Sequence, residues 1–376
     1  MTPRVTVLLA VHNGEPYVRD AVESVLDQTH RDFEFVIVDD ASTDGTVATI
    51  ESFDDKRIRL FRNERNLGQV PSLNRGLREA RGAIVARIDA DDVSRPTRLE
   101  RQLAVLDADP RVGLVGSWMT LVDERGRRVG ALHETLADYV DFVFHTLIMR
   151  VYVSHPAAMY RREPVVALGG YDEATGPSED KDLWRKLTLG RWDARIVPEE
   201  LVVYRLHDAQ LSHTRAAYQR EVDARSQEGF LAAVAPDVDV PGVRMLLADD
   251  PALWRTPIDL EAAFTGIDAV VFGVSDRLGI DAAGLSRLRG LVGRWLVGVA
   301  ARRPWTGRAR AIAAYGLSLL QQDERTAALF AAAPRAVAAP GRVMLAGVAR
   351  RASTSAPSVR RWRAARRLYG KLLGGG

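Results

Sequence analysis

Apolar runs of strand length alternate with helical patterns along the first ninety residues of the chain. The run from Val5 to Val11 is almost continuous, whereas the segment from about Glu15 to Gln28 repeats its apolar residues at helical spacing. Strands that alternate with helices predict an α/β fold with a mostly parallel sheet. The predicted elements are strands Val5–Val11, Phe33–Val38, Arg57–Phe61 and Ala83–Ile88, helices Glu15–Gln28 and Val70–Ala80, and a polar turn Asp39–Gly45 able to cap a further helix.

The regular alternation of predicted strands and helices ends after about residue 90. A hairpin is predicted from Val112 to Val129, with Asp123–Gly126 at its turn. It is followed by helical segments near Leu136–Met149 and Asp180–Leu189 and by strand-like runs Ala194–Val197 and Leu201–Tyr204. After about His213 alanine, leucine and arginine dominate and helical patterns prevail. We therefore expect a boundary near residues 215–240, which divides the chain into residues 1–215 and a mainly α-helical region, residues 216–376.

Three polar clusters fall where predicted parallel strands end. They are His12-Asn13, Asp39-Asp40 and Asp89–Asp92. In parallel sheets ligands bind beyond the carboxyl ends of the strands, so these clusters are expected to meet at one edge and to line a binding site.

The third cluster places three carboxylates within four residues, directly after an apolar strand. Carboxylates this close repel one another, so a cation is expected to neutralise them at the end of a buried strand. Hard oxygen ligands suit Mg²⁺ or Mn²⁺. The alternative is a solvated loop before a helix that begins at Pro96, with Asp92 or Ser94 as its N-cap. The position beside the other two clusters favours the metal site.

Composition excludes several classes of chemistry. The 376 residues suffice for about two domains, and 47% hydrophobic and 27% charged residues are ordinary for a globular protein. The absence of cysteine excludes disulfides, thiolate metal sites and cysteine nucleophiles. His12–Glu15 interrupts the first apolar run too early for a signal peptide, and charges and prolines cut the C-terminal apolar stretches. We expect a soluble or peripheral protein.

Taken together and in order, the motifs of residues 4 to 213 resemble family 2 glycosyltransferases, which have the GT-A fold. Each motif alone is weak evidence, and the ordered set is strong. The matching segments are Val7–Glu15, Ser24–Thr29, Val38–Thr46, Asn66-Leu67-Gly68, Asp89–Asp92, Gly169–Asp172, Glu179–Trp184 and Tyr204–His207. The resemblance does not extend beyond about residue 215.

The resemblance implies an inverting, metal-dependent transfer of a sugar from a nucleotide diphosphate to an acceptor hydroxyl. It assigns the Mg²⁺ or Mn²⁺ to Asp91, with His207 as an additional metal or diphosphate ligand. It also implies that Asp89 accepts hydrogen bonds from ribose or sugar hydroxyls, whereas Asp92 either assists or caps the next helix, the second being favoured. The remaining nucleotide-sugar contacts fall on Ala10, His12, Asn13, Glu15, Asp39, Asp40 and Ala90, with Asp40 favoured over Asp39 for the base of a UDP- or dTDP-type donor.

Asp180 matches the position of the family's general base, which takes the proton of the acceptor hydroxyl. Glu179 beside it is expected to raise the pKa of Asp180 or to orient it. The alternative is that both simply supply acidic residues to the first turn of a helix.

The C-terminal tail is basic, since no acidic residue follows Glu324. Residues 360–373 combine arginines with Trp, Leu and Tyr at roughly helical spacing, which is typical of an interfacial helix on anionic lipid. A solvated terminus is the alternative, and no nucleic-acid module is recognised. We expect a cytoplasmic protein with a glycan or lipid-linked acceptor, in cell-envelope polysaccharide, glycolipid or glycoconjugate synthesis. The membrane interpretation adds a peripheral position at the cytoplasmic face of the membrane and favours the lipid-linked acceptor.

Two other classes of function fit parts of the sequence. A sugar-nucleotide pyrophosphorylase also builds a nucleotide site on a parallel sheet, but it normally has a glycine-rich basic loop where this chain has His12–Glu15. A non-catalytic sugar-nucleotide-binding scaffold is the other alternative. The presence of Asp89, Asp91 and Asp180 argues against it.

Overall fold

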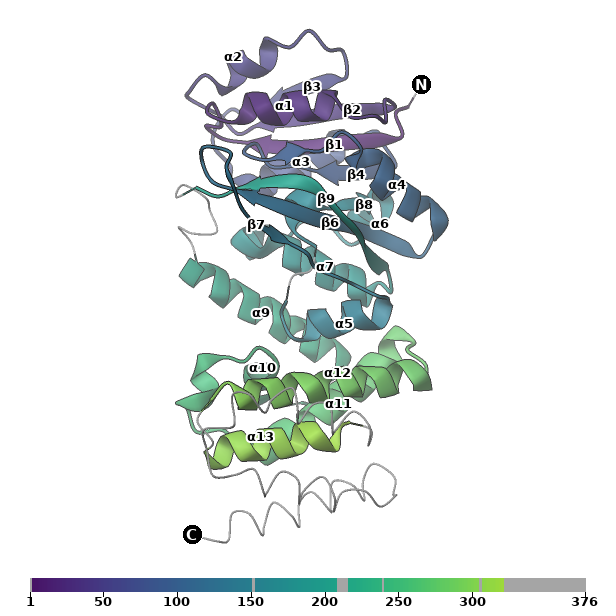
Figure 1. The fold of residues 1–376 in the computed structure, drawn as a ribbon, viewed down its shortest axis with the longest axis vertical. Helices are drawn as coiled ribbons and strands as arrows, with labels where there is room; N and C mark the ends of the chain where they lie inside the picture. The colour runs from purple at the N-terminus through teal and green to yellow at the C-terminus, as the bar shows by residue number, and fades with distance from the viewer. Residues whose placement is uncertain (1, 151–152, 208–215, 239, 304–305, 321–376) are drawn as a thin grey trace. The chain divides into compact units, whose positions relative to one another are not determined.

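The computed structural model describes residues 2–150, 153–207, 216–238, 240–303 and 306–320 (Figure 1). These residues form two compact units. The first comprises Met1–Thr146 and Arg150–Ser226, and the second comprises Leu147–Met149 and the chain from Gln227 onward. The boundary between Ser226 and Gln227 falls inside the helix α9 (Ala216–Val234). The basic tail, residues 360–373, lies outside the described residues.

All the strands of the described residues belong to the first unit. They are β1 (Val5–Val11), β2 (Phe33–Asp39), β3 (Ile58–Arg62), β4 (Ile84–Arg87), β5 (Val93–Ser94), β6 (Val112–Val122), β7 (Arg128–Leu132), β8 (Met159–Arg161) and β9 (Asp193–Arg205). Its helices are α1 (Val18–Leu26), α2 (Thr46–Glu51), α3 (Gln69–Glu79), α4 (Arg98–Ala108), α5 (Tyr139–Leu147), α6 (Arg162–Ala167), α7 (Glu179–Leu189) and the start of α9 (Ala216–Val234), with 3-10 turns His155–Ala157 and Glu173–Ser178.

The strands form one mixed sheet in the order β3-β2-β1-β4-β8-β6-β9-β5, with β7 paired to β6. The first four are parallel, and their register places Val11 opposite Asp39 and Leu8 opposite Arg87. The three loops that follow β1, β2 and β4 therefore leave the sheet at the same edge. β8 runs antiparallel to both β4 and β6, so the parallel order ends there.

Both faces of the sheet are covered, because alternate residues of the central strands point to opposite sides. Val7 and Leu9 of β1 belong to a core that also contains side chains of α1, α2 and α4. Leu8 belongs to a second core with side chains of α3, α5, α6 and α7. This two-sided burial explains the nearly continuous apolar sequence of β1 and β2, and it confirms the α/β prediction (Figure 1).

Several local predictions need correction. The runs predicted as two strands, Ala194–Val197 and Leu201–Tyr204, are one strand, β9, whose register to β6 shifts near Ser117 and Trp118. The helix predicted to begin at Pro96 begins at Arg98, with Thr97 at its N-cap. Trp184 of α7 is buried in the core and donates its indole N–H to the carbonyl of Val153.

The second unit is helical. Besides the end of α9 it contains α10 (Val240–Leu247), a 3-10 turn (Pro251–Trp254), α11 (Leu260–Leu278), α12 (Ala282–Ala301) and α13 (Gly307–Ser318). The side chains of Asp259, Asp281 and Thr306 cap α11, α12 and α13. Among the described residues, no helix has the length and apolar character needed to cross a membrane.

A glycine pair sets the packing distance between α12 and α13. A Cβ on Gly293 would lie 2.7 Å from the carbonyl oxygen of Gly316, whereas a Cβ on Gly298 of the same helix would meet nothing closer than 3.7 Å. Alanine favours a helix over glycine by about 1 kcal/mol, but overpacking costs about 1–3 kcal/mol. We expect Gly298→Ala to raise the denaturant midpoint and Gly293→Ala to lower it. Equal midpoints for the two variants would contradict this packing.

Candidate functional site

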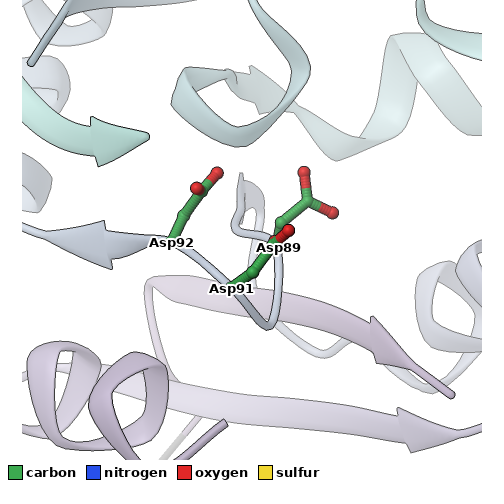
Figure 2. Close-up of side chains that lie close together, drawn as sticks. All are labelled: Asp89, Asp91 and Asp92. Carbon is green, nitrogen blue, oxygen red and sulfur yellow. The ribbon is translucent and has the colours of Figure 1, made fainter. Parts of the chain in front are cut away.

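The acidic loop directly follows β4, and its three carboxylates lie together (Figure 2). Ile88 is fully buried and anchors the loop, and a ligand atom from each of Asp89, Asp91 and Asp92 lies within 4.8 Å of the others. The expected convergence of these carboxylates is therefore present. Their mutual repulsion at this separation favours the binding of a cation.

Asp92 is the most buried of the three, with 1% of its surface exposed. One oxygen, Oδ1, accepts a hydrogen bond of 3.0 Å from the backbone N–H of Arg205, and Oδ2 has no hydrogen-bond partner in the described structure. Burial, followed by the charges of Asp91 and Asp89, raises the pKa of Asp92 well above its ordinary value. The expected helix-capping role is wrong, because Asp92 precedes β5 and Thr97 precedes α4. Its unpartnered oxygen points instead to a ligand.

Asp91 lies beside the imidazole of His207. The Oδ2 of Asp91 and the Nε2 of His207 are 2.8 Å apart, and burial together with the charge of Asp89 raises the pKa of Asp91. Neighbouring ligands in an octahedral shell with bonds of about 2.1 Å lie about 3 Å apart, so both atoms can serve one Mg²⁺ or Mn²⁺. Carboxylate oxygens with one imidazole nitrogen are a donor set suited to these ions.

Arg205, at the end of β9, connects the acidic cluster to α1 through its side chain. It was not among the predicted site residues. Its Nε donates to the carbonyl of Asp91, its Nη2 pairs with Asp20 at 3.1 Å, and its guanidinium lies over the ring of Tyr17. The ring of Tyr17 also lies 5.3 Å from that of His207. The only signal in the sequence is its place in the Tyr204–His207 motif.

The loops after β1 and β2 are bonded to each other by residues expected to contact the nucleotide. Nδ1 of His12 lies 2.8 Å from the carbonyl of Asp40, Asn13 accepts from the N–H of Thr43, and Glu15 accepts from the N–H of Gly45 at the start of α2. His12, Asn13 and Glu15 thus shape the edge of the site through these bonds. Ala10 and Ala90 are partly buried against the two cores.

Asp39 and Asp40, the two candidates for the base contact, differ in the hydrogen bonds that their carboxylates accept. The carboxylate of Asp40 accepts from Asn63 Nδ2, from the N–H of Leu67 and from the N–H of Gly68, at 2.7–2.9 Å. It therefore anchors the loop before α3. Asp39 accepts only a long contact of 3.3 Å from the N–H of Ser42 among the bonds described. A carboxylate can accept about four hydrogen bonds, so Asp39 has more unused capacity for a ligand than Asp40.

Glu179 and Asp180, the two candidate catalytic carboxylates, are the first residues of α7. Glu179 is buried, with its Oε1 3.5 Å from Nδ1 of His155. Burial raises the pKa of Glu179 to about 7. Burial and the neighbouring Glu179 charge also raise the pKa of Asp180. A carboxylate with a raised pKa is suited to accept a proton from a substrate hydroxyl.

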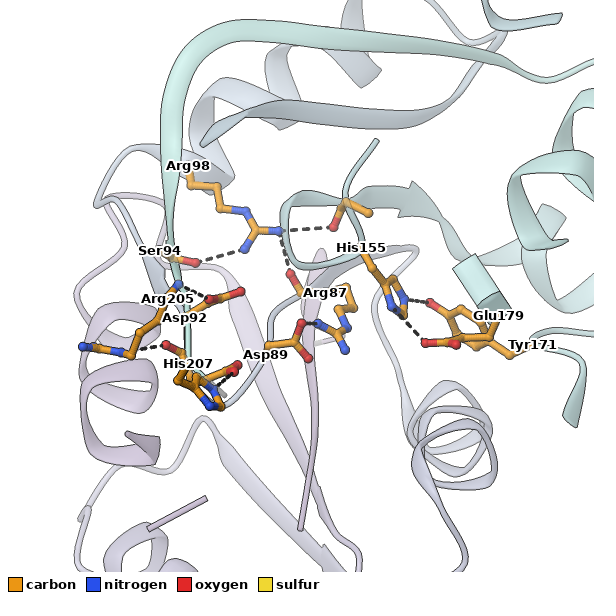
Figure 3. Close-up of polar contacts among 12 residues, drawn as sticks. Arg87, Asp89, Asp92, Ser94, Arg98, His155, Tyr171, Glu179, Arg205 and His207 are labelled. Atoms are coloured by element: carbon orange, nitrogen blue, oxygen red, sulfur yellow. Dashed lines mark hydrogen bonds and ion pairs between the residues drawn. The ribbon is translucent and has the colours of Figure 1, made fainter. Parts of the chain in front are cut away.

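The imidazole of His155 contacts both Glu179 and Tyr171 (Figure 3). Nε2 of His155 lies 2.9 Å from the hydroxyl of Tyr171, which in turn lies 3.0 Å from the hydroxyl of Tyr160. Burial lowers the pKa of His155 to about 3, so its ring is neutral at physiological pH. His155 is buried and belongs to the interior of the protein.

The glycines of the Gly169–Asp172 motif place Tyr171 in this network. Gly169 and Gly170 have φ values of 88° and 71°, which side chains rarely adopt, and a Cβ on Gly170 would lie 2.8 Å from Oδ1 of Asn74. Asn74 holds the backbone of Tyr171 through two hydrogen bonds, of 2.8 and 3.0 Å. The motif therefore has a packing role that supports the site.

Two fully buried arginines lie under the site and were not among the predicted residues. Arg87, the last residue of β4, forms an ion pair with Asp89. Arg98 of α4 donates to the carbonyls of Arg87 and Ala158, to Ser94 and to Gln102. An arginine inside an otherwise apolar strand is the signal in the sequence, because arginine is rarely buried without a partner.

Comparisons with protein-family models and with known proteins all find glycosyltransferases. The family model described as Glycosyl transferase family 2 matches residues 6–169. An uncharacterized glycosyltransferase of Methanocaldococcus jannaschii is 32% identical over 208 residues, which are 54% of this chain and 71% of that protein. The O-antigen biosynthesis glycosyltransferase WbnJ of Escherichia coli is 29% identical over 223 residues, 57% of this chain and 84% of WbnJ.

Among solved structures, residues 1–349 of S. aureus TarS in complex with UDP-GlcNAc superpose with a TM-score of 0.54. The match covers 82% of this chain and 90% of that one at 18% sequence identity. At this identity the likeness concerns the fold.

Proposed function

Because the chain belongs to glycosyl transferase family 2 and has the GT-A fold, we propose that it transfers a sugar from a nucleotide diphosphate to an acceptor hydroxyl with inversion at the anomeric carbon. One observation carries the proposal. Three carboxylates converge at the carboxyl end of β4, and one of them, Asp92, keeps a buried oxygen without a partner. Such a cluster suits a divalent cation that binds a diphosphate.

Asp91, with Asp89, Asp92 and His207 around it, would hold the Mg²⁺ or Mn²⁺, which supplies positive charge for the departing diphosphate. Inversion in one displacement requires a base on the face opposite the leaving group. Asp180 accepts the proton of the acceptor hydroxyl, and burial together with the charge of Glu179 raises the pKa of Asp180, which makes it a stronger base.

The donor is a nucleotide sugar, and we propose a UDP- or dTDP-type base. A carboxylate accepts a hydrogen bond from an imide N–H such as that of uracil, and Asp39 is the carboxylate with capacity for it. This assignment replaces Asp40, which holds the loop before α3. The complex of TarS with UDP-GlcNAc concerns a protein of the same fold and supports the choice of nucleotide.

The acceptor is proposed to be a glycan or a lipid-linked sugar of the cell envelope, at the cytoplasmic face of the membrane. The relation to a glycosyltransferase of O-antigen biosynthesis supports an envelope polysaccharide. The basic, aromatic tail supports a surface of anionic lipid as the place of reaction.

A panel of nucleotide sugars tests the proposed activity. The full chain with Mn²⁺ should release nucleoside diphosphate slowly from one class of donor, because water substitutes poorly for the acceptor. Chelation of the metal should stop this release. Release of inorganic pyrophosphate, from a sugar phosphate and a nucleoside triphosphate, would identify a pyrophosphorylase instead.

Removal of residues 355–376 should release the chain from vesicles of anionic lipid. The segment carries six basic residues, each worth about 1 kcal/mol near an anionic surface: Arg360, Arg361, Arg363, Arg366, Arg367 and Lys371. Sedimentation with vesicles measures the bound fraction, and vesicles of neutral lipid are the control. Equal binding of the full and shortened chains would dispose of the membrane contact.

A further inference from the structure

An exposed tyrosine lies beside the end of α7 that carries Asp180. Tyr218 belongs to the first turn of α9, and 47% of its surface is exposed. Among the described residues of the first unit, no other phenylalanine, tyrosine or tryptophan is as exposed. Single exposed aromatic side chains are common on protein surfaces, so the surroundings of Tyr218 decide whether it has a role.

The helices α7 and α9 lie side by side (Figure 1), and their contacts follow the same order along both. Asp223 of α9 pairs with Lys181 of α7 at 2.5 Å. Three residues later, Ser226 accepts a hydrogen bond of 2.5 Å from Arg185 and donates one of 2.9 Å to Asp182. Because Asp223 and Arg185 are buried, these contacts fix the two helices against each other. The start of α9 therefore lies at the start of α7.

Tyr218 extends past the start of α7. It precedes Asp223 by five residues, whereas Asp180 precedes its neighbour Lys181 by one. At about 1.5 Å per residue, Tyr218 is displaced from Asp180 by about one helical turn along the two helices. Gly176, in the turn before α7, has a φ of 28°, and a Cβ added there would lie 3.9 Å from Cε1 of Tyr218. The tyrosine ring thus borders the segment that leads into the two candidate catalytic carboxylates.

Asp180 is the more accessible of these two carboxylates. It is partly exposed, whereas Glu179 is 6% exposed. A substrate hydroxyl can therefore reach Asp180 from solvent at the first turn of α7, and the molecule that carries the hydroxyl must then lie over the surface next to that turn. Tyr218 is part of this surface. The C–H faces of a pyranose ring are apolar and pack well on an aromatic ring, while the hydroxyls of the sugar stay free for polar partners.

We propose that Tyr218 is a platform on which a pyranose ring of the acceptor stacks while a hydroxyl of the acceptor approaches Asp180. That the stacked sugar is the acceptor rests on the proposed function, but the stacking itself requires no transfer. Tyr218 and Gly176 both lie outside residues 6–169, which the family model matches. The platform therefore adds a preference of this chain for acceptors that present the apolar face of a pyranose ring.

Binding of methyl glycosides to the full chain tests the platform in the absence of a donor. The probes are methyl glycosides of the common hexoses and N-acetylhexosamines, followed by saturation-transfer NMR. At least one should bind, with the strongest saturation on the protons of one ring face. Tyr218→Ala should weaken its binding at least about tenfold, because the apolar contact is lost. Tyr218→Phe should stay within about twofold of the wild type, because stacking uses the ring and not the hydroxyl.

Because Tyr218 is exposed, both variants should unfold at the temperature of the wild type. Phe272→Ala, which removes an exposed aromatic side chain of α11, is the matched control and should bind the glycoside like the wild type. Equal binding by Tyr218→Ala and the wild type would overturn the platform, and so would a wild type that binds none of the glycosides. Once the donor is known, the KM for the bound glycoside as acceptor should rise in Tyr218→Ala as its affinity falls. Binding that depends on Tyr218, without any transfer, would refute the proposed function and leave the platform standing.

Discussion

Asp91→Asn should lower the rate of sugar transfer by about a thousandfold. Stabilisation of a departing diphosphate by a bound divalent cation is worth several kcal/mol, and each 1.4 kcal/mol is a factor of ten in rate. Asn keeps the size of Asp91 but loses the charge that neutralises the cation. The measurement is kcat/KM for the donor identified by the panel, at saturating Mn²⁺ for the wild type.

Two controls separate this loss from unfolding. Asp91 has a raised pKa in the folded, metal-free protein, so the stability that its protonated form contributes is present at low pH and lost as pH rises through that pKa. Near neutral pH, metal-free Asp91→Asn should therefore unfold at the same temperature as the wild type or higher. Asp20→Asn removes a neighbouring carboxylate outside the metal cluster and should keep activity within about twofold. Wild-type activity in Asp91→Asn would contradict the metal assignment.

Asp180→Asn should lower kcat by about 10²–10⁴-fold, the usual contribution of a general base. In the proposed arrangement the nucleotide binds at the opposite end of the site, so the affinity for the nucleotide should change little. Asp182→Asn is the matched control, because Asp182 lies on the same helix but bonds to Ser226 and Lys186. An Asp180→Asn enzyme that turns over normally would mean that another group takes the proton.

The proposed role of Asp180 as the general base also predicts how kcat/KM depends on pH. The proposed base Asp180 acts only when deprotonated, and its raised pKa places the acidic limb of kcat/KM at higher pH than an ordinary aspartate would. Glu179→Gln removes the charge that raises the pKa of Asp180. The acidic limb should therefore move to lower pH in that variant. A limb that stays in place would exclude Glu179 as the neighbour that tunes the base.

Much of the site follows from the sequence because the parallel strands have clear ends. The apolar runs of β1, β2 and β4 stop at polar residues, and the register of a parallel sheet brings those ends together. The acidic loop was predicted for this reason. β8 was missed, since a strand of three residues, Met159–Arg161, is too short for any periodicity, yet it ends the parallel order next to β4.

The roles of individual carboxylates depend on partners that are distant in sequence. Asp92 accepts from the N–H of Arg205, 113 residues later, and Asp40 is satisfied by the 63–68 loop. The sequence around Asp92 or Asp40 does not show whether the carboxylate caps a helix, binds a ligand or holds a distant loop. The buried charge of Arg87 is a similar case, because its burial becomes favourable only when Asp89 and α7 surround it.

Binding of Mn²⁺ to the full chain tests the central claim most directly. Free Mn²⁺ can be followed by electron paramagnetic resonance while wild type and Asp91→Asn are titrated in the presence of UDP. The wild type should bind one ion per chain, and Asp91→Asn should bind it at least about a hundredfold more weakly, because loss of a ligand costs no less than loss of a group that supports one. Equal affinity of the two proteins for Mn²⁺ would contradict a metal site at Asp89–Asp92.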